Sequence, residues 1–129
     1  MRQEYRVEGL SEPLSHYTHA VRHNDLLFVS GLAPVDAAGK LVGGDDVVAQ
    51  TRQIFANLAR ILAAADAKPA DVLKVTVFLI SVADRTKINP VRQQFFGAAR
   101  PASTLVGVSE LAIPGMRIEI EAVVGLGRQ

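Results

Sequence analysis

The sequence contains no cysteine and no tryptophan, and only 5% of its residues are aromatic. The absence of cysteine excludes a disulfide framework, a thiolate metal site and a cysteine nucleophile, and it fits a reducing compartment. The apolar runs are too short to span a bilayer, and the N-terminal segment MRQEYRVEGL lacks the apolar core of a signal peptide. We therefore expect a soluble cytoplasmic protein that does not bind membranes.

An excess of charge of one sign is also missing. Lys and Arg number 14 and Asp and Glu number 13, which gives a net charge of +1, and the basic residues are scattered. Such a surface has no electrostatic footprint for nucleic acid or anionic lipid, so we expect neither as a partner. With 129 residues, of which 49% are hydrophobic, the chain can bury one core, and residues 1–129 are predicted to form a single domain.

Hydrophobic periodicity predicts elements in the order β-β-α-β-α-β-β. The first two strands form a hairpin around Asn24 and Asp25. The predicted ranges are strands 17–22 and 26–32, a helix 46–67, a strand 73–80, a helix 84–96, and strands 104–108 and 116–124. This pattern is typical of an α+β domain in which two helices pack on one face of a mixed sheet.

The strand 73–80 is apolar on both faces. Val75, Val77 and Leu79 share one face, whereas Phe78 and Ile80 lie on the other. Because two helices can cover only one face of the sheet, we expect a second subunit to bury the opposite face in a closed homo-oligomer. The alternative is that the N-terminal segment covers Phe78 and Ile80.

The last strand carries Arg117, Glu119 and Glu121 on one face. One interpretation is that these are solvated charges on an exposed face. The other is that a carboxylate at a sheet edge or subunit boundary is partly desolvated, which raises its pKa toward a range useful for acid–base catalysis. The sequence alone leaves both open.

Three histidines, His16, His19 and His23, cluster around Tyr17. Their spacing resembles that of metal ligands on a helix, but on the predicted strand His16 and His19 face opposite sides. Because a metal site needs convergent ligands, we expect no metal, and we expect one histidine at the surface and another in a pocket.

The dipeptide Asn89-Pro90 has two interpretations. It is a helix-start signal, at which the second helix would begin or kink, or it presents a polar amide at a pocket mouth. The glycines of GLAPVDAAGKLVGG do not have the spacing of a phosphate loop, and no nucleophile elbow or dinucleotide fingerprint is present. No cofactor is expected.

Four segments in order resemble one known family. LLFVSGLAPVD, the run from QTRQIFANL to NPVRQQFF, RPASTLVGV and IPGMRIEIEAVV resemble the Rid (YjgF) family, also called the endoribonuclease L-PSP or translation-inhibitor family, over about residues 14–124. The resemblance implies a chorismate-mutase-like fold of the bacillus type, a homotrimer, and ligand clefts between subunits. It also implies hydrolysis of reactive imines and enamines, such as 2-aminoacrylate, to 2-keto acids and ammonia.

The resemblance carries over to four residues of this chain. Tyr17 matches the tyrosine of the family cleft, and Gly31 matches a glycine whose backbone contacts the ligand. Asn89 matches a polar helix residue near the cleft. Glu119 matches the carboxylate that positions or activates water, and is therefore the expected catalytic residue.

One departure from the family pattern concerns ligand specificity. The imine-hydrolysing branch has Pro-Ala-Arg followed by Ser or Thr, and this arginine binds the substrate carboxylate. Here Ser103 stands at the arginine position and Thr104 follows it, while Arg100 precedes the proline and is not equivalent. Because a charge-assisted contact contributes about 1.5–3 kcal/mol, we expect Ser103 and Thr104 to bind a neutral or less carboxylate-dependent ligand. His19 is then a candidate proton shuttle near neutral pH.

Three functions remain open from the sequence. The first is a small-molecule hydrolase resembling imine and enamine deaminases, with specificity altered at Ser103. The second is a different small-molecule enzyme in the same cleft, such as a tautomerase or a catabolic hydrolase. The third is a non-catalytic metabolite-binding or regulatory protein.

Overall fold

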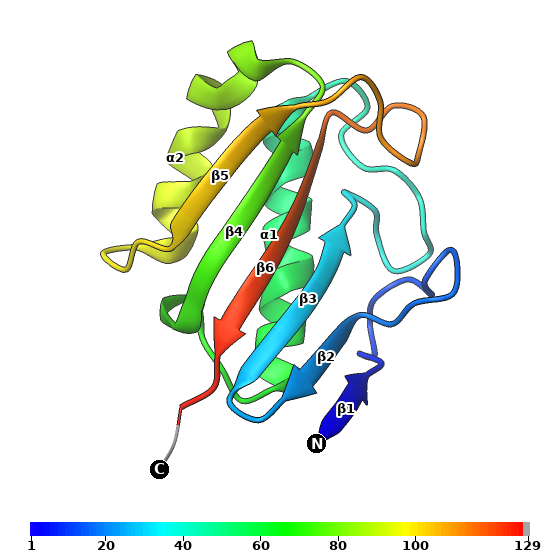
Figure 1. The fold of residues 1–129 in the computed structure, drawn as a ribbon. Helices are drawn as coiled ribbons and strands as arrows, with labels where there is room; N and C mark the ends of the chain where they lie inside the picture. The colour runs from blue at the N-terminus through cyan, green and yellow to red at the C-terminus, as the bar shows by residue number, and fades with distance from the viewer. Residues whose placement is uncertain (128–129) are drawn as a thin grey trace.

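A computed structural model describes residues 1–127, which form a six-stranded mixed sheet with two helices against one face (Figure 1). The strands are β1 (Arg2–Tyr5), β2 (Ala20–His23), β3 (Leu26–Leu32), β4 (Val72–Leu79), β5 (Ala102–Gly107) and β6 (Ile118–Gly125). The helices are α1 (Val47–Ala64) and α2 (Arg85–Phe96), with short 3-10 turns at Pro69–Asp71 and Val82–Asp84. Strand order is β1-β2-β3-β6-β4-β5, and β4 and β5 pair in parallel while the other neighbours are antiparallel. The predicted α+β class is confirmed.

The first helix begins where the sequence provides a cap and ends earlier than predicted. The Asp46 side chain accepts hydrogen bonds from the backbone N–H groups of Val48 and Ala49, at 2.9 and 3.2 Å. At the other end Asp66 adopts a left-handed conformation, with φ of 58°. A residue in this conformation stops the helical path, so α1 ends at Ala64 rather than near residue 67.

The second helix runs through Pro90, so the interpretation of Asn89-Pro90 as a helix start is wrong. The helix begins at Arg85, and Pro90 lies inside it. A proline removes one helical hydrogen bond, and packing on both sides of it offsets that loss. Ile88 and Val91 are buried next to Pro90. Further along, the ring of Phe95 stacks on that of Phe55 in α1, with 4.6 Å between the centroids.

The N-terminal segment forms a strand that the sequence did not predict. Residues 2–5 pair with β2, and Tyr5 lies opposite Ala20. The hairpin strand begins at Ala20 rather than at residue 17, and before it the Thr18 hydroxyl donates to the Tyr5 carbonyl at 2.7 Å. His16 and His19 precede this strand, so the expectation that they face opposite sides of it is wrong.

The core lies between the helices and one face of the sheet. Val75, Val77 and Leu79 of β4 are at most 1% exposed there. In the single chain the other face is open, and Phe28, Leu73 and Ile80 are 46%, 51% and 38% exposed. Strand β1 pairs with β2, on the side of the sheet away from β4, so the N-terminal segment does not cover Ile80 (Figure 1).

A buried ion pair joins the start of β6 to the start of α2. Arg117 donates from Nη2 to Oδ2 of Asp84 at 3.0 Å, and Lys87 Nζ lies 3.2 Å from Oδ1 of the same carboxylate. The Asp84 side chain is 2% exposed. Burial raises the pKa of Asp84, but the hydrogen bonds from Arg117 and Lys87 outweigh it and leave the pKa below its ordinary value. The interpretation of Arg117 as a solvated charge is therefore wrong.

Candidate functional site

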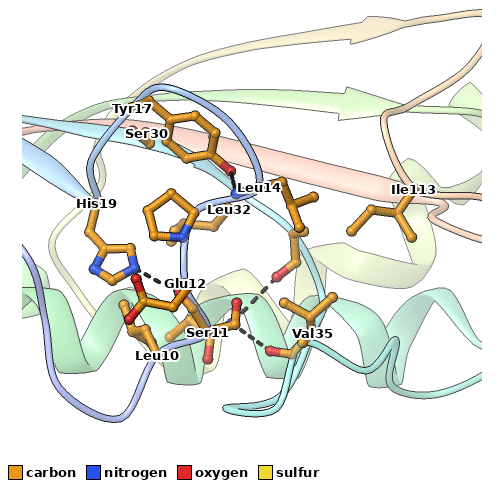
Figure 2. Close-up of a pocket in the computed structure, with 15 residues that line it drawn as sticks. Leu10, Ser11, Glu12, Leu14, Tyr17, His19, Ser30, Leu32, Val35 and Ile113 are labelled. Carbon is orange, nitrogen blue, oxygen red and sulfur yellow. Dashed lines mark hydrogen bonds between the residues drawn. The ribbon is translucent and has the colours of Figure 1, made fainter.

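A hollow opens beside the end of β3 (Figure 2). Residues 10–14 and Tyr17 form one wall, and Ile113 lies on the opposite side. The Tyr17 hydroxyl accepts a hydrogen bond from the Leu14 backbone N–H at 3.2 Å, which holds the ring at the mouth of the hollow. Gly31 is also among its lining residues. We refer to this cavity as the Tyr17 hollow.

Glu119 of β6 lies directly over Gly31 of β3. A Cβ atom placed on Gly31 would be 2.1 Å from Oε2 of Glu119, so any larger residue at position 31 would displace the carboxylate. The register between β3 and β6 shifts between Val29 and Leu32, at the point where Gly31 approaches Glu119. Gly31 therefore links two parts of the cleft that the resemblance implies, because it lines the Tyr17 hollow and lies against Glu119, which is not itself among the lining residues.

The environment of Glu119 disfavours its charged form. The side chain is half-buried, and burial raises its pKa above the ordinary value of 4.5. The negative charge of Glu121, two residues along the same face, raises the pKa of Glu119 further. Within residues 1–127 no hydrogen-bond donor or cation compensates the Glu119 carboxylate. Such a group can take up a proton at a higher pH than an ordinary glutamate.

Replacing Gly31 by alanine is expected to reduce any turnover that depends on Glu119 on the order of 10²-fold with little loss of stability, because a small displacement of a catalytic group has an effect of that size. The new methyl group meets the flexible end of Glu119, which can rotate away without moving the backbone. Steady-state kinetics and a thermal melt of the same preparation measure the two effects. Unchanged kinetics in Gly31→Ala would contradict the assigned position of the carboxylate.

His19 is buried, and both nitrogens of its ring form hydrogen bonds with the backbone. The residue is 7% exposed, its Nδ1 accepts from the Val7 backbone N–H at 2.8 Å, and its Nε2 lies 2.9 Å from the Ser11 carbonyl oxygen. With Nδ1 as acceptor, Nε2 carries the proton and donates to Ser11 (Figure 2). Both nitrogens therefore hold the segment that forms one wall of the Tyr17 hollow. This arrangement disagrees with the proton shuttle expected from the sequence.

A second hollow lies beside α2 and the start of β5. Asn89 and Arg92 of α2, together with Arg100 and Pro101, are among its lining residues. Ser103 faces this side of the sheet, because it pairs with the buried Val75, and its Oγ accepts a hydrogen bond from Arg92 Nη2 at 2.9 Å. We refer to this cavity as the Arg92 hollow.

The structure brings some of the predicted site residues together and separates others. Thr104 pairs with Thr76 and points to the face opposite Ser103, so the two do not line one surface. Asn89 and Ser103 lie near the β5 edge, and strands β4 and β6 separate them from the Tyr17 hollow. Each chain thus presents two separate groups of candidate residues.

Arg92 is the residue that the sequence reasoning missed. It lies three positions after Asn89, and residues with this spacing share a helix face. That spacing was the available signal, since an amide expected at a pocket mouth predicts that the next polar residue on the same face also reaches the pocket. The contact with Ser103 depends on how α2 packs beside β5, and no local pattern in the sequence encodes it.

Among residues 1–127 no group of three or more His, Cys, Asp or Glu side chains is placed to hold a metal ion. Over the same residues no helix is long and apolar enough to cross a membrane.

The sheet order, with two helices on one face and a glutamate resting on a glycine, places the chain among α+β proteins with the chorismate-mutase-like fold. It belongs to the YjgF/Rid family, because the family model described as Endoribonuclease L-PSP matches residues 9–125. The predicted family resemblance is thus confirmed.

Similar proteins include named deaminases. A RutC family protein of Pyrococcus horikoshii is 38% identical over 124 residues, which cover 95% of this chain and 97% of the relative. The 2-iminobutanoate/2-iminopropanoate deaminase of Dermatophagoides farinae is 31% identical over 113 residues, which cover 88% of each chain. The crystal structure of the YjgF gene product of E. coli has a TM-score of 0.87 and 30% identity, covering 95% of this chain and 98% of that one.

Proposed function

We propose that this protein is a cytoplasmic hydrolase that releases ammonia from small reactive imines or enamines. The observation that carries the proposal is the position of Glu119, whose carboxylate has a raised pKa, lies over the backbone of Gly31 and is close to the Tyr17 hollow. A similar protein is named for deamination of 2-iminobutanoate and 2-iminopropanoate, which are substrates of this class.

The proposed reaction uses Glu119 first as a base and then as an acid. Glu119 accepts a proton from water while the water oxygen attacks the carbon of the protonated C=N bond, and the electron pair of that bond moves to nitrogen, which becomes a neutral amine. The protonated carboxyl then gives its proton to this nitrogen, and the C–N bond breaks as an electron pair of the hydroxyl oxygen forms the carbonyl. The ionised Glu119 takes the hydroxyl proton and passes it to the departing ammonia, so one protonated imine and one water give one keto compound and one ammonium ion, and Glu119 is regenerated. Tyr17 orients the ligand at the mouth of the hollow.

The site is proposed to be completed between subunits of a homotrimer. The open face of the sheet exposes large apolar side chains, including Phe28, Leu73 and Ile80, and such a patch is typical of an interaction surface. We propose that the same trimer also brings the Arg92 hollow, at the β5 edge of one subunit, against the Tyr17 hollow, beside the end of β3 of the next. In that arrangement Asn89 would contact the ligand whose hydrolysis Glu119 assists.

The homotrimer predicts a molar mass three times that of the chain at micromolar concentration. Size-exclusion chromatography with multi-angle light scattering measures this mass directly. A Phe28→Glu variant puts a charge on the proposed interface and is expected to shift the mass toward that of the monomer, whereas Arg52→Glu, on the exposed side of α1, leaves it unchanged. A monomeric wild-type protein would contradict the shared site.

The deaminase activity is tested by ammonia release from 2-iminopropanoate and 2-iminobutanoate generated enzymatically in the assay. The purified protein is compared with buffer alone, because such imines also hydrolyse without a catalyst. Ammonia release well above the buffer rate, proportional to protein concentration, is the expected result. A rate equal to that of buffer with both substrates would contradict the proposal.

The dependence of activity on pH reports the ionisation of the Glu119 carboxylate. A base must be ionised, so kcat/KM is expected to fall as the pH drops through the pKa of Glu119, which is raised above 4.5. Glu121→Gln removes one of the two causes of that shift and should move this acid limb to lower pH. The exposed Glu110→Gln serves as a matched charge control and should leave the limb in place. An unmoved limb in Glu121→Gln would contradict the assignment of the limb to Glu119.

A further inference from the structure

The guanidinium of Arg92 has an unusual environment for a surface helix. The side chain is half-buried on α2, and burial lowers its pKa from the ordinary value. Its polar contact is the hydrogen bond from Nη2 to the hydroxyl of Ser103. Among residues 1–127 no carboxylate lies within ion-pair distance of Arg92. A partly desolvated cation without a counter-charge is costly to the fold, and an anionic ligand would compensate it.

The Arg92 hollow suits such a ligand. Its lining supplies two cations, Arg92 and Arg100, and the side-chain amides of Asn89 and Gln93, and it includes no carboxylate. A guanidinium carries five N–H donors in a planar fork that matches a carboxylate. Since the contact with Ser103 uses one of them, the others remain for a ligand.

The role of Ser103 follows from the direction of this hydrogen bond. Its hydroxyl accepts from Arg92, so Ser103 fixes the orientation of the guanidinium. Position 103 itself carries no cation, but the guanidinium of Arg92, from the neighbouring helix, contacts its side chain. The expectation of a neutral ligand considered position 103 alone.

We propose that Arg92, oriented by Ser103, binds the carboxylate of the substrate, which makes the substrate an imine or enamine of a small carboxylic acid. This inference rests on the proposed deaminase function, because it assigns the acidic end of the same ligand. In the trimer the carboxylate would lie in the Arg92 hollow of one subunit while the C=N carbon lies beside Glu119 of the next. Ser103 is a positioning residue, and Arg92 determines specificity.

Binding of a stable carboxylate tests the inference without turnover. Isothermal titration compares pyruvate with its neutral isostere pyruvamide. The wild type is expected to bind pyruvate about 10- to 100-fold more tightly than pyruvamide. Arg92→Met should reduce this preference to within about threefold, and Arg92→Lys should restore part of it, because an ammonium keeps the charge and loses the fork. Arg85→Met, on an exposed position of the same helix, is the control and keeps the full preference.

The Ser103→Ala variant tests whether Ser103 orients the guanidinium of Arg92 or only supports the fold. Its expected effect is a severalfold weaker binding of pyruvate with unchanged binding of pyruvamide, and a higher KM for 2-iminopropanoate at unchanged kcat. Equal wild-type affinities for the two probes, or no binding of pyruvate, would overturn the inference. The inference would also be overturned if Arg100→Met lost the preference for pyruvate over pyruvamide while Arg92→Met kept it.

The two proposals fail in different ways. Pyruvate binding that depends on Arg92, without release of ammonia from either imine, would contradict the deaminase and leave the carboxylate site standing. Ammonia release with an unchanged KM and pyruvate preference in Arg92→Met would contradict the carboxylate site and leave the deaminase standing.

Discussion

Glu119→Gln is expected to release ammonia from 2-iminopropanoate on the order of 10²- to 10⁴-fold more slowly than the wild type, which is the usual contribution of a positioned acid–base group. Glutamine keeps the size of the side chain over Gly31, so the effect reports on the lost proton transfer rather than on packing. Steady-state kcat, measured by a coupled ammonia assay at one pH above the acid limb, gives the ratio.

The control for this prediction is Glu110→Gln, an exposed glutamate outside both hollows, and its activity should equal that of the wild type. Glu119→Gln is also expected to be at least as stable as the wild type at neutral pH, because it removes a half-buried charge that lacks a compensating partner among the described residues. A Glu119→Gln protein with turnover within about twofold of the wild type would show that another group handles the proton.

The largest expected loss of stability is in Asp84→Ala, at about 3 kcal/mol in the free energy of unfolding. Removing this carboxylate leaves the partly buried Arg117 with only the exposed Asp45, 3.1 Å from Nη1, as a counter-charge, and Nε of Arg117 already has no hydrogen-bond partner among the described residues. Urea unfolding at a fixed protein concentration measures the change, since the proposed homotrimer would make the stability depend on concentration.

Lys87→Ala is the matched comparison. This lysine contacts the same carboxylate, but its side chain is 63% exposed, so the expected loss is at most about 1 kcal/mol. Equal losses of stability in Asp84→Ala and Lys87→Ala would contradict the assignment of Arg117 as the main partner of Asp84.

The same ion pair sets a pH dependence of stability. The folded pKa of Asp84 lies below its ordinary value of 3.8, so the carboxylate stabilises the fold above that pH. This contribution is lost as the pH falls from about 3.8 through the lower folded pKa. The difference in the free energy of unfolding between the wild type and Asp84→Asn should therefore become smaller as the pH falls through this range. A difference that stays constant there would contradict the lowered pKa.

Strong local patterns made most of the fold predictable. The helical spacing of Ile54, Leu58 and Ile61 and the β-branched run of β4 each indicate one element, and both elements formed. Strand β1 was missed because its residues RQEY are polar and mostly exposed, and they form a strand only by pairing with β2. The predicted helix 84–96 includes Pro90, and only the alternative of a helix start at Asn89-Pro90 is wrong, because Ile88 and Val91 pack on both sides of Pro90 inside one helix.

The part of the candidate site that lies on neighbouring strands of the sheet was predictable. Glu119 and Gly31 follow from the family pattern, and their contact agrees with it. The contact between Arg92 and Ser103 spans 11 positions and joins a helix to a strand, so it depends on tertiary packing. The pairs that the sequence could not reveal, Arg92 with Ser103 and Arg117 with Asp84, are both of this kind.

The central claim is that one reaction site combines the Tyr17 hollow of one subunit with the Arg92 hollow of another, and mixed trimers test it most directly. Glu119→Gln removes the acid–base group, and Asn89→Trp fills the Arg92 hollow from an exposed helix position. Each variant alone is expected to be nearly inactive. When the two are unfolded and refolded together in equal amounts, about a quarter of the sites pair an intact Glu119 with an intact hollow, because each requirement is met in about half of the subunits. Ammonia release near a quarter of the wild-type rate is the predicted result. A refolded trimeric mixture no more active than the separate variants would contradict a shared site.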